Sequence, residues 1–193
     1  MIHRGFQAVA VAFVLGLLAV LVWKVVHNPT SPVIRAEQSD TPIPAPLFTK
    51  DRVNGTGKLS LSSLHGKVVV LNFWQSYCAP CTAEARTLST SAKQWAGKGV
   101  VFVGVDEQDL RGPALKFIRR FDITYPIVAD NLSLTSLYGV TGYPETFFIS
   151  PSGEVIPLPP THDSVCNCTQ SGHVVGGASA ATLDAGIKQA RTA

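Results

Sequence analysis

The chain has 193 residues, a formal net charge of +3, and charged side chains at 15% of its positions, against roughly 25% in ordinary soluble domains. Disorder requires low hydrophobicity and high net charge, and nucleic-acid binding requires clustered basic residues, so this composition argues against both. The length allows one domain of about 150 residues with additional segments. A core of that size needs no disulfide for stability, so the four cysteines are candidates for chemistry or metal binding.

The N-terminal segment is the most apolar part of the sequence. After residues 1–5, the stretch 6–26 is almost wholly apolar, and as a helix it covers about 31 Å, close to the roughly 30 Å hydrocarbon core of a membrane. We interpret it as an uncleaved transmembrane anchor; a cleaved signal peptide is the alternative, although no small-x-small cleavage site follows Trp23. Arg4 favours a cytoplasmic N-terminus. We therefore expect a single-pass protein of the cell (inner) membrane, with the remainder in an extracytoplasmic or periplasmic, oxidising compartment.

Residues 27–46 have the composition of an extended linker. The segment contains Pro29, Pro32, Pro42, Pro44 and Pro46. Proline-rich segments are semi-rigid spacers, so we expect this one to separate the membrane from a folded domain at residues 47–193.

The remaining sequence alternates between strand and helix patterns, which predicts an α/β fold with a mixed central sheet flanked by helices. The run 68–74 is nearly continuously apolar, as expected for a strand buried on both faces. The turn sequence at 150–153 predicts a hairpin, and Ser179 is a candidate N-cap for the last helix. The expected strands are 68–74, 100–105, 127–129, 145–149 and 154–156, and the expected helices are 78–95, 112–120, 132–138 and 180–190.

The sequence Cys78-Ala79-Pro80-Cys81 directly follows the first buried strand and opens a helix. Cysteines at this spacing can close a disulfide, and backbone N–H groups at a helix N-terminus stabilise a thiolate on Cys78. Cys81 would then resolve the mixed disulfide formed by Cys78. Half of a zinc site and a purely structural bridge remain alternatives.

Two segments resemble the membrane-anchored thioredoxin-like proteins of the TlpA, ResA and CcmG (DsbE) group. They are VVLNFWQSYCAPC at 69–81 and GVTGYPETF at 139–147. The resemblance covers roughly residues 45–157 and 174–190, and it implies a thioredoxin-like fold. It also implies that Tyr143–Pro144 is a cis peptide bond opposite the cysteines, which sequence alone merely permits.

The resemblance draws attention to two glutamates. Glu84 follows Cys81 by three residues, and Glu145 follows Pro144; the CcmG pattern has a glutamate at both places. Such carboxylates would raise the pKa of the Cys78 thiol, and either could accept a proton. Without the resemblance, an exposed helix charge is the simpler interpretation of Glu84.

The function that these features imply is a membrane-tethered thiol–disulfide oxidoreductase, with the redox-active Cys78–Cys81 pair and no other cofactor. The expected clients are protein disulfides, such as those of apocytochrome c during cytochrome c maturation. A membrane thiol carrier of the DsbD or CcdA type would supply the electrons. The alternatives are a general reductase of TlpA or ResA type, a copper-handling thioredoxin-like protein, and a peroxiredoxin; the peroxiredoxin would need a Thr-x-x-Cys arrangement that the segment 74–81 does not supply.

A second cysteine cluster lies in residues 158–172, an insertion relative to the usual short hairpin, and at its exit. The residues are His162, Cys166, Cys168 and His173, and thiolates with imidazoles suit Zn²⁺ or Cu(I). A local or intermolecular disulfide and free thiols are the competing interpretations. We expect this insertion to lie at the end of the domain opposite Cys78.

Overall fold

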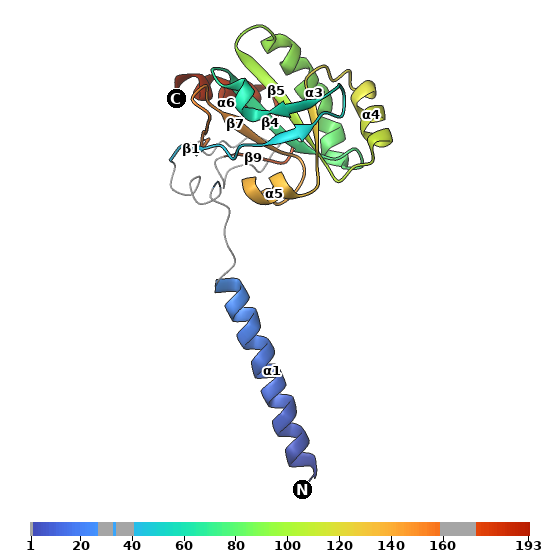
Figure 1. Cartoon of the computed structure of the whole chain (residues 1–193), viewed down its shortest axis with the longest axis vertical. Coiled ribbons are helices and arrows are strands. Elements are labelled where there is room, and N and C mark those ends of the chain that lie inside the picture. Colours follow the sequence, from blue (N-terminus) through green and yellow to red (C-terminus); the bar gives the residue numbers. More distant parts are fainter. Residues whose placement is uncertain (1, 27–32, 34–40, 159–172) are drawn as a thin grey trace. The chain divides into compact units, whose positions relative to one another are not determined.

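The structure is a computed structural model that describes residues 2–26, 33, 41–158 and 173–193 (Figure 1). It divides into two compact units, Met1–Thr30 and Ser31–Ala193. The first unit contains one helix, α1 (Ile2–Val26). Within the described part of the chain, no helix combines the length and the apolar character that crossing a membrane requires. The transmembrane anchor expected at 6–26 is therefore not confirmed.

The second unit is built around a mixed sheet with the strand order β1-β8-β7-β4-β5-β6, in which β9 also pairs with β7. β4, β5 and β6 are parallel, whereas β7, β8 and β1 continue the sheet with antiparallel pairing. The strands are β1 (Ile43–Pro44), β4 (Val68–Trp74), β5 (Val100–Glu107), β6 (Ile127–Asp130), β7 (Glu145–Ile149), β8 (Glu154–Val155) and β9 (Val174–Val175). A separate hairpin consists of β2 (Thr49–Asp51) and β3 (Lys58–Ser60).

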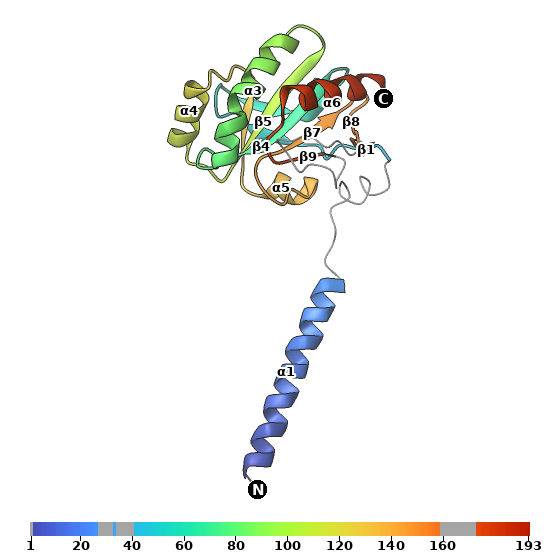
Figure 2. The same cartoon turned by 180° about the vertical axis from the view of Figure 1, so that it is seen from behind.

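The helices and the core lie on both faces of this sheet. All seven residues of β4 are buried, and its apolar side chains alternate between two hydrophobic clusters, as the nearly continuous apolar run predicts. One cluster joins the sheet to α3 (Ala79–Trp95), α4 (Arg111–Arg120) and α6 (Ala180–Thr192), and α3 and α6 pack against each other (Figure 2). The other joins the sheet to α5 (Ser133–Tyr138) and the 3-10 helix η1 (Leu61–Leu64).

The fold agrees with the expected mixed α/β arrangement and differs in detail. Ser179 is the N-cap of α6, and its hydroxyl accepts the N–H of Thr182 at 3.1 Å, as predicted. α4 begins at Arg111, one residue before the expected start at 112, so Pro113 is the third helical residue. A proline is tolerated there because the N–H groups of the first turn have no intrahelical acceptor. β1 belongs to the sheet although it falls in the stretch assigned to the linker, and Pro44 is compatible with an edge strand.

Candidate active site

The Cys78–Cys81 pair lies between the carboxyl end of β4 and the start of α3. The two residues form a disulfide. Cys78 is the N-cap of α3, and its sulfur accepts the N–H of Cys81 at 3.1 Å. Cys78 is half-buried, whereas Cys81 is 1% exposed. The accessible sulfur is thus the one that receives the helix N–H group, and this geometry stabilises a thiolate on Cys78 after reduction.

The loop before β7 completes the surroundings of the disulfide. The Tyr143–Pro144 peptide bond is cis, which confirms the prediction from the resemblance. The carbonyl oxygen of Tyr143 lies 3.4 Å from the sulfur of Cys78. Residues so far apart in sequence meet because β4 and β7 pair antiparallel, with Phe73 opposite Glu145. A backbone edge therefore lies beside the half-buried Cys78, where a partner polypeptide in extended form could pair with it.

Glu84 is a buried carboxyl group behind the disulfide, not an exposed helix charge. It is 4% exposed and accepts hydrogen bonds from the side-chain amide of Asn72 at 2.9 Å and from the N–H of Ala178 at 2.8 Å. Burial raises the pKa of Glu84 to about 7, and these two hydrogen bonds oppose the rise. Glu84 and Cys81 line the same small cavity of about 10 Å³, close to the minimum volume that one water requires.

The carboxylate of Glu145 contacts the loop before the cis peptide bond and the imidazole of His173. One of its oxygens accepts the N–H and hydroxyl of Thr141 and the N–H of Gly142, at 2.8–3.0 Å, and the other lies 3.0 Å from Nε2 of His173. Burial alone would raise the pKa of Glu145, but the hydrogen bond and charge of His173 and the Thr141 donors outweigh it, so the pKa is lowered. The imidazole of His173 also stacks on Phe147, with ring centroids 4.2 Å apart. These contacts hold the residues just before the Tyr143–Pro144 cis bond in place.

Sequence reasoning missed the carboxylate that holds the loop between β4 and Cys78. Asp109 accepts the N–H of Ser76 at 2.6 Å and its hydroxyl at 2.9 Å. Asp106, 3% exposed, lies nearby at the end of β5; burial raises its pKa to about 8, and the charge of Asp109, a shared hydrogen bond and the charge of Glu107 add to the rise. The sequence pattern that could have identified Asp109 is a group of acids directly after a strand that neighbours the cysteine strand.

Of the second cysteine cluster, His162, Cys166 and Cys168 lie outside the described residues. The remaining member, His173, makes the contact with Glu145 given above. Among the residues that the structure describes, no group of three or more His, Cys, Asp or Glu side chains is arranged to hold a metal ion. The metal site at this cluster stays a prediction.

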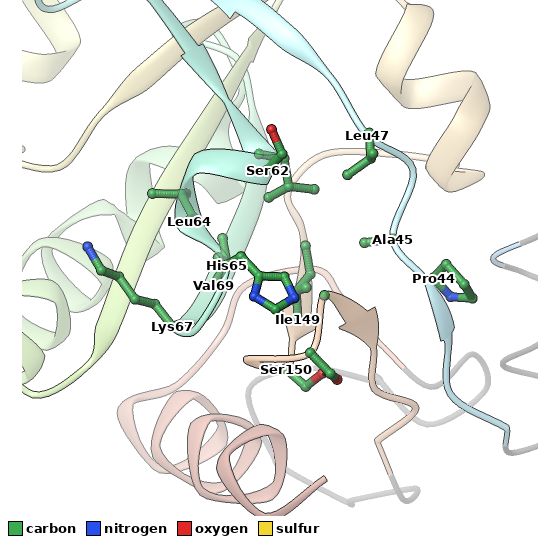
Figure 3. A pocket seen from close by; sticks show the side chains of 13 residues that line it. Pro44, Ala45, Leu47, Ser62, Leu64, His65, Lys67, Val69, Ile149 and Ser150 are labelled. Atoms are coloured by element: carbon green, nitrogen blue, oxygen red, sulfur yellow. The ribbon is translucent and has the colours of Figure 1, made fainter.

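A sizeable apolar pocket lies away from the disulfide. It has a volume of about 320 Å³ and is formed between β1, η1, the start of β4 and the β7–β8 turn (Figure 3). The ionisable residues of its lining are His65 and Lys67, and the lining contains no cysteine. Since β4 is seven residues long, the pocket and Cys78 lie at opposite ends of that strand. Apolar pockets are the usual first candidates for small-molecule sites, but neither cysteine of the disulfide lines this one.

The profile of the AhpC/TSA family matches residues 43–157, a range that includes the disulfide, Glu84 and the cis peptide bond. The chain belongs to the AhpC/TSA family. Within this family, the segment 69–81 and the cis-proline loop resemble the corresponding segments of proteins that exchange disulfides. The names of the relatives, a thiol-disulfide oxidoreductase and a thiol:disulfide interchange protein, agree with that resemblance.

Two curated relatives are the thiol-disulfide oxidoreductase ResA of Bacillus subtilis (strain 168) and the thiol:disulfide interchange protein DsbE of Pseudomonas fluorescens biotype C. The ResA protein is 33% identical over 113 residues, 58% of this chain and 63% of the relative. The DsbE protein is 35% identical over 116 residues, 58% of this chain and 62% of the relative. The chain thus spans somewhat less than two thirds of the length of these relatives.

A solved structure covers more of the chain. The thiol:disulfide interchange protein of the thioredoxin family from Chlorobium tepidum TLS is 30% identical, with a TM-score of 0.64, over 77% of this chain and 96% of that one. The thioredoxin-like fold is therefore established.

Proposed function

We propose that this AhpC/TSA-family chain is a thiol–disulfide oxidoreductase that reduces disulfides in client proteins through Cys78 and Cys81. The observation that carries the proposal is the Cys78–Cys81 disulfide at the start of α3, with the carbonyl of Tyr143 3.4 Å from the Cys78 sulfur. The names of the ResA and DsbE relatives agree with it.

The geometry assigns a different role to each cysteine. In the reduced protein, the Cys78 thiolate attacks one sulfur of the client disulfide, so the client's other sulfur leaves as a thiolate and a mixed disulfide forms. Cys81 then loses its proton and attacks the Cys78 sulfur, which releases the client's second thiol and closes Cys78–Cys81. The client gains two electrons and two protons. The burial of Cys81 supports this order, since a client disulfide can reach only Cys78.

Glu84 is the group best placed to manage the proton of Cys81. It lines the same cavity as Cys81, and its pKa of about 7 lets it exchange a proton near neutral pH. In this proposal Pro144 shapes the client-binding edge and Glu145 positions it.

The clients that we propose are disulfides of extracytoplasmic proteins such as apocytochrome c, reduced during cytochrome c maturation. The DsbE relative and the Pro-Glu-Thr sequence at 144–146 support this choice. The ResA relative supports the alternative, a general reductase of ResA type. We further propose that α1 tethers the domain to the cell membrane, where a thiol carrier of DsbD or CcdA type reduces Cys78–Cys81 again. The apolar composition of residues 6–26 supports the tether.

A test of the activity compares four forms of the full chain in nonionic detergent, with insulin as a disulfide substrate. Wild type should accelerate the reduction of insulin by dithiothreitol above the rate with dithiothreitol alone, and Cys78→Ser should not. Cys81→Ser, reduced and then freed of dithiothreitol, should accumulate a mixed disulfide with the client, visible as an added mass. The matched control is Cys166→Ser/Cys168→Ser, which removes two other cysteines and should keep full activity. Activity retained in Cys78→Ser, or faster reaction of Cys78 with a hydroperoxide than with any disulfide, would overturn the proposal.

The client and the tether need separate measurements. A disulfide-bonded peptide that carries the Cys-x-x-Cys-His sequence of apocytochrome c should be reduced faster than insulin if cytochrome c maturation is the role. After cell fractionation, the full chain should sediment with membranes, and a variant lacking residues 2–26 should not.

A further inference from the structure

Helix α4 carries a concentration of positive charge close to the disulfide. Its ten residues include Arg111, Lys116, Arg119 and Arg120 and no acidic residue. All four side chains are exposed. Within the described ranges, none of them forms a salt bridge with a carboxylate. The charge of this helix is therefore available to a partner.

Two of these side chains border a hollow next to the active-site loop. The hollow has a volume of about 210 Å³ and is lined by Ser76, Pro113, Lys116, Phe117 and Arg120. Ser76 lies two residues before Cys78. The ring of Phe117 stacks on Trp74, the last residue of β4, with centroids 4.5 Å apart. The hollow thus has an aromatic lining and a cationic rim, and it adjoins the segment that holds the reactive sulfur.

A residue of α3 extends the positive surface. The guanidinium groups of Arg86 and Arg120 lie 5.9 Å and 5.1 Å from the centroid of the Phe121 ring. Cation–π contacts of this kind position the groups without neutralising them. We call Arg86, Lys116 and Arg120 the basic surface.

The neighbouring acids offset only part of this charge. Asp109 accepts two hydrogen bonds from neutral donors of Ser76, so its carboxylate offsets one of the positive charges. Asp106 has a pKa of about 8, raised chiefly by burial, so it is mostly uncharged at neutral pH. Asp122 pairs with Lys93 at 2.5 Å. A net positive potential therefore remains beside Cys78.

We infer that the basic surface and its hollow dock an acidic segment of the polypeptide that exchanges a disulfide with Cys78, an apolar side chain of that segment occupying the hollow. This inference rests on the proposed oxidoreductase function and adds the class of partner to it. An acidic segment matches the charge of the rim, and an apolar residue within it matches the Phe117 lining. Its docking beside Ser76 would bring a cysteine a few residues away to the Cys78 sulfur.

The experiment uses two synthetic peptides with the same intramolecular disulfide and the same apolar residue. Asp and Glu flank the disulfide in one peptide, and Asn and Gln replace them in the other. The full chain in nonionic detergent is reduced, freed of excess reductant and mixed with each peptide. Exchange moves two electrons from Cys78 and Cys81 to the peptide and is followed by quenching with acid and mass spectrometry. At low salt the acidic peptide should react about tenfold faster, and the two rates should converge at about 1 M salt.

Charge variants locate the effect. Lys116→Gln/Arg120→Gln should bring the acidic-to-neutral rate ratio close to one through a slower reaction of the acidic peptide, and Lys116→Glu/Arg120→Glu should invert it. The control Lys67→Gln/Lys98→Gln removes the same charge at the far ends of β4 and α3 and should keep the preference. Equal rates in wild type, or a preference that survives in Lys116→Gln/Arg120→Gln, would overturn the inference. If wild type exchanges with neither peptide, the proposed function itself fails; if it reduces the neutral peptide equally well, only the docking surface fails.

Discussion

Burial keeps the carboxyl group of Glu84 protonated up to about neutral pH, because it raises the pKa from the ordinary value of 4.5 to about 7. The cost of placing its charge among Asn72, Tyr125 and Trp74 exceeds the benefit of its two hydrogen bonds. This residue therefore links protonation to both folding and redox chemistry.

The effect on folding has a definite sign. The pKa of Glu84 is about 7 in the folded protein, against an ordinary value of 4.5 in the unfolded chain, so the folded state binds the proton more tightly. The resulting stability is fully present below pH 4.5 and is lost as the pH rises through 7. Glu84→Gln has no ionisable group at this position, so it does not lose this stability as the pH rises. The difference in free energy of unfolding, variant minus wild type, should therefore increase between pH 4.5 and 8 by on the order of 3 kcal/mol. Denaturant unfolding at a series of pH values measures it, and parallel curves for the two proteins would contradict it.

The two glutamates should differ in their effect on the thiols. Above pH 7 the ionised Glu84 repels a nearby thiolate, so Glu84→Gln should lower the thiol pKa values of the reduced protein. Glu145→Gln should shift them less, because the Glu145 carboxylate is committed to Thr141, Gly142 and His173. Ultraviolet absorbance of the thiolates, titrated in wild type and both variants, distinguishes the residues. Equal shifts in the two variants would return Glu145 to the role expected from sequence.

The residues that sequence identified are those whose role depends on local spacing. Cys78 and Cys81 belong to one turn of a helix, and Pro144 belongs to one motif. By contrast, the contact of Asp109 with Ser76 and that of His173 with Glu145 join different loops. Nothing in the spacing of these residues along the chain predicts such contacts, because the arrangement of the strands creates them.

At the scale of elements, α6 approaches β7 so closely that it depends on a glycine. A Cβ atom on Gly186 would lie 2.5 Å from the ring of Phe148. Gly186→Ala should therefore destabilise the protein by about 1–2 kcal/mol, because overpacking outweighs the gain in helix propensity. The comparison variant is Gly112→Ala in α4, where a Cβ atom has no neighbour within 4 Å apart from the adjacent residues. It should change stability by less than about 1 kcal/mol, because the gain in helix propensity is opposed by crowding against Pro113. Denaturant midpoints compare the two, and a stabilising Gly186→Ala would contradict the packing.

The elements that sequence predicted are those with a mainly apolar run or an interpretable cap. β4 and β7 appear with the expected bounds, and α6 begins after its Ser179 cap. The short strands β2 and β3 were missed because their residues are mainly exposed and polar, so no apolar alternation marks them. Their pairing is decided by contacts with the rest of the domain.

For the whole molecule, the core and not the disulfide accounts for stability. The disulfide joins residues three apart, so its effect on the entropy of the unfolded chain is limited to about 2 kcal/mol. Two hydrophobic clusters, one on each face of the sheet, remain when it is opened. The reduced protein and Cys78→Ser/Cys81→Ser should both keep the native circular dichroism spectrum and unfold cooperatively. Loss of cooperative unfolding on reduction would assign the disulfide a structural role.

The two borders of the sheet bear on self-association. A sheet border with free N–H and C=O groups can recruit a strand from another molecule and start aggregation. Here β1 is only two residues long and includes Pro44, which has no N–H to offer. On the other side, Arg52 forms an antiparallel bridge with Val128 of β6, and the N–H of Val53 donates to the carbonyl of Ile127 at 2.8 Å. Both edges of the sheet therefore offer few free backbone groups, so even at high protein concentration the sheets of different molecules should not join into fibrils.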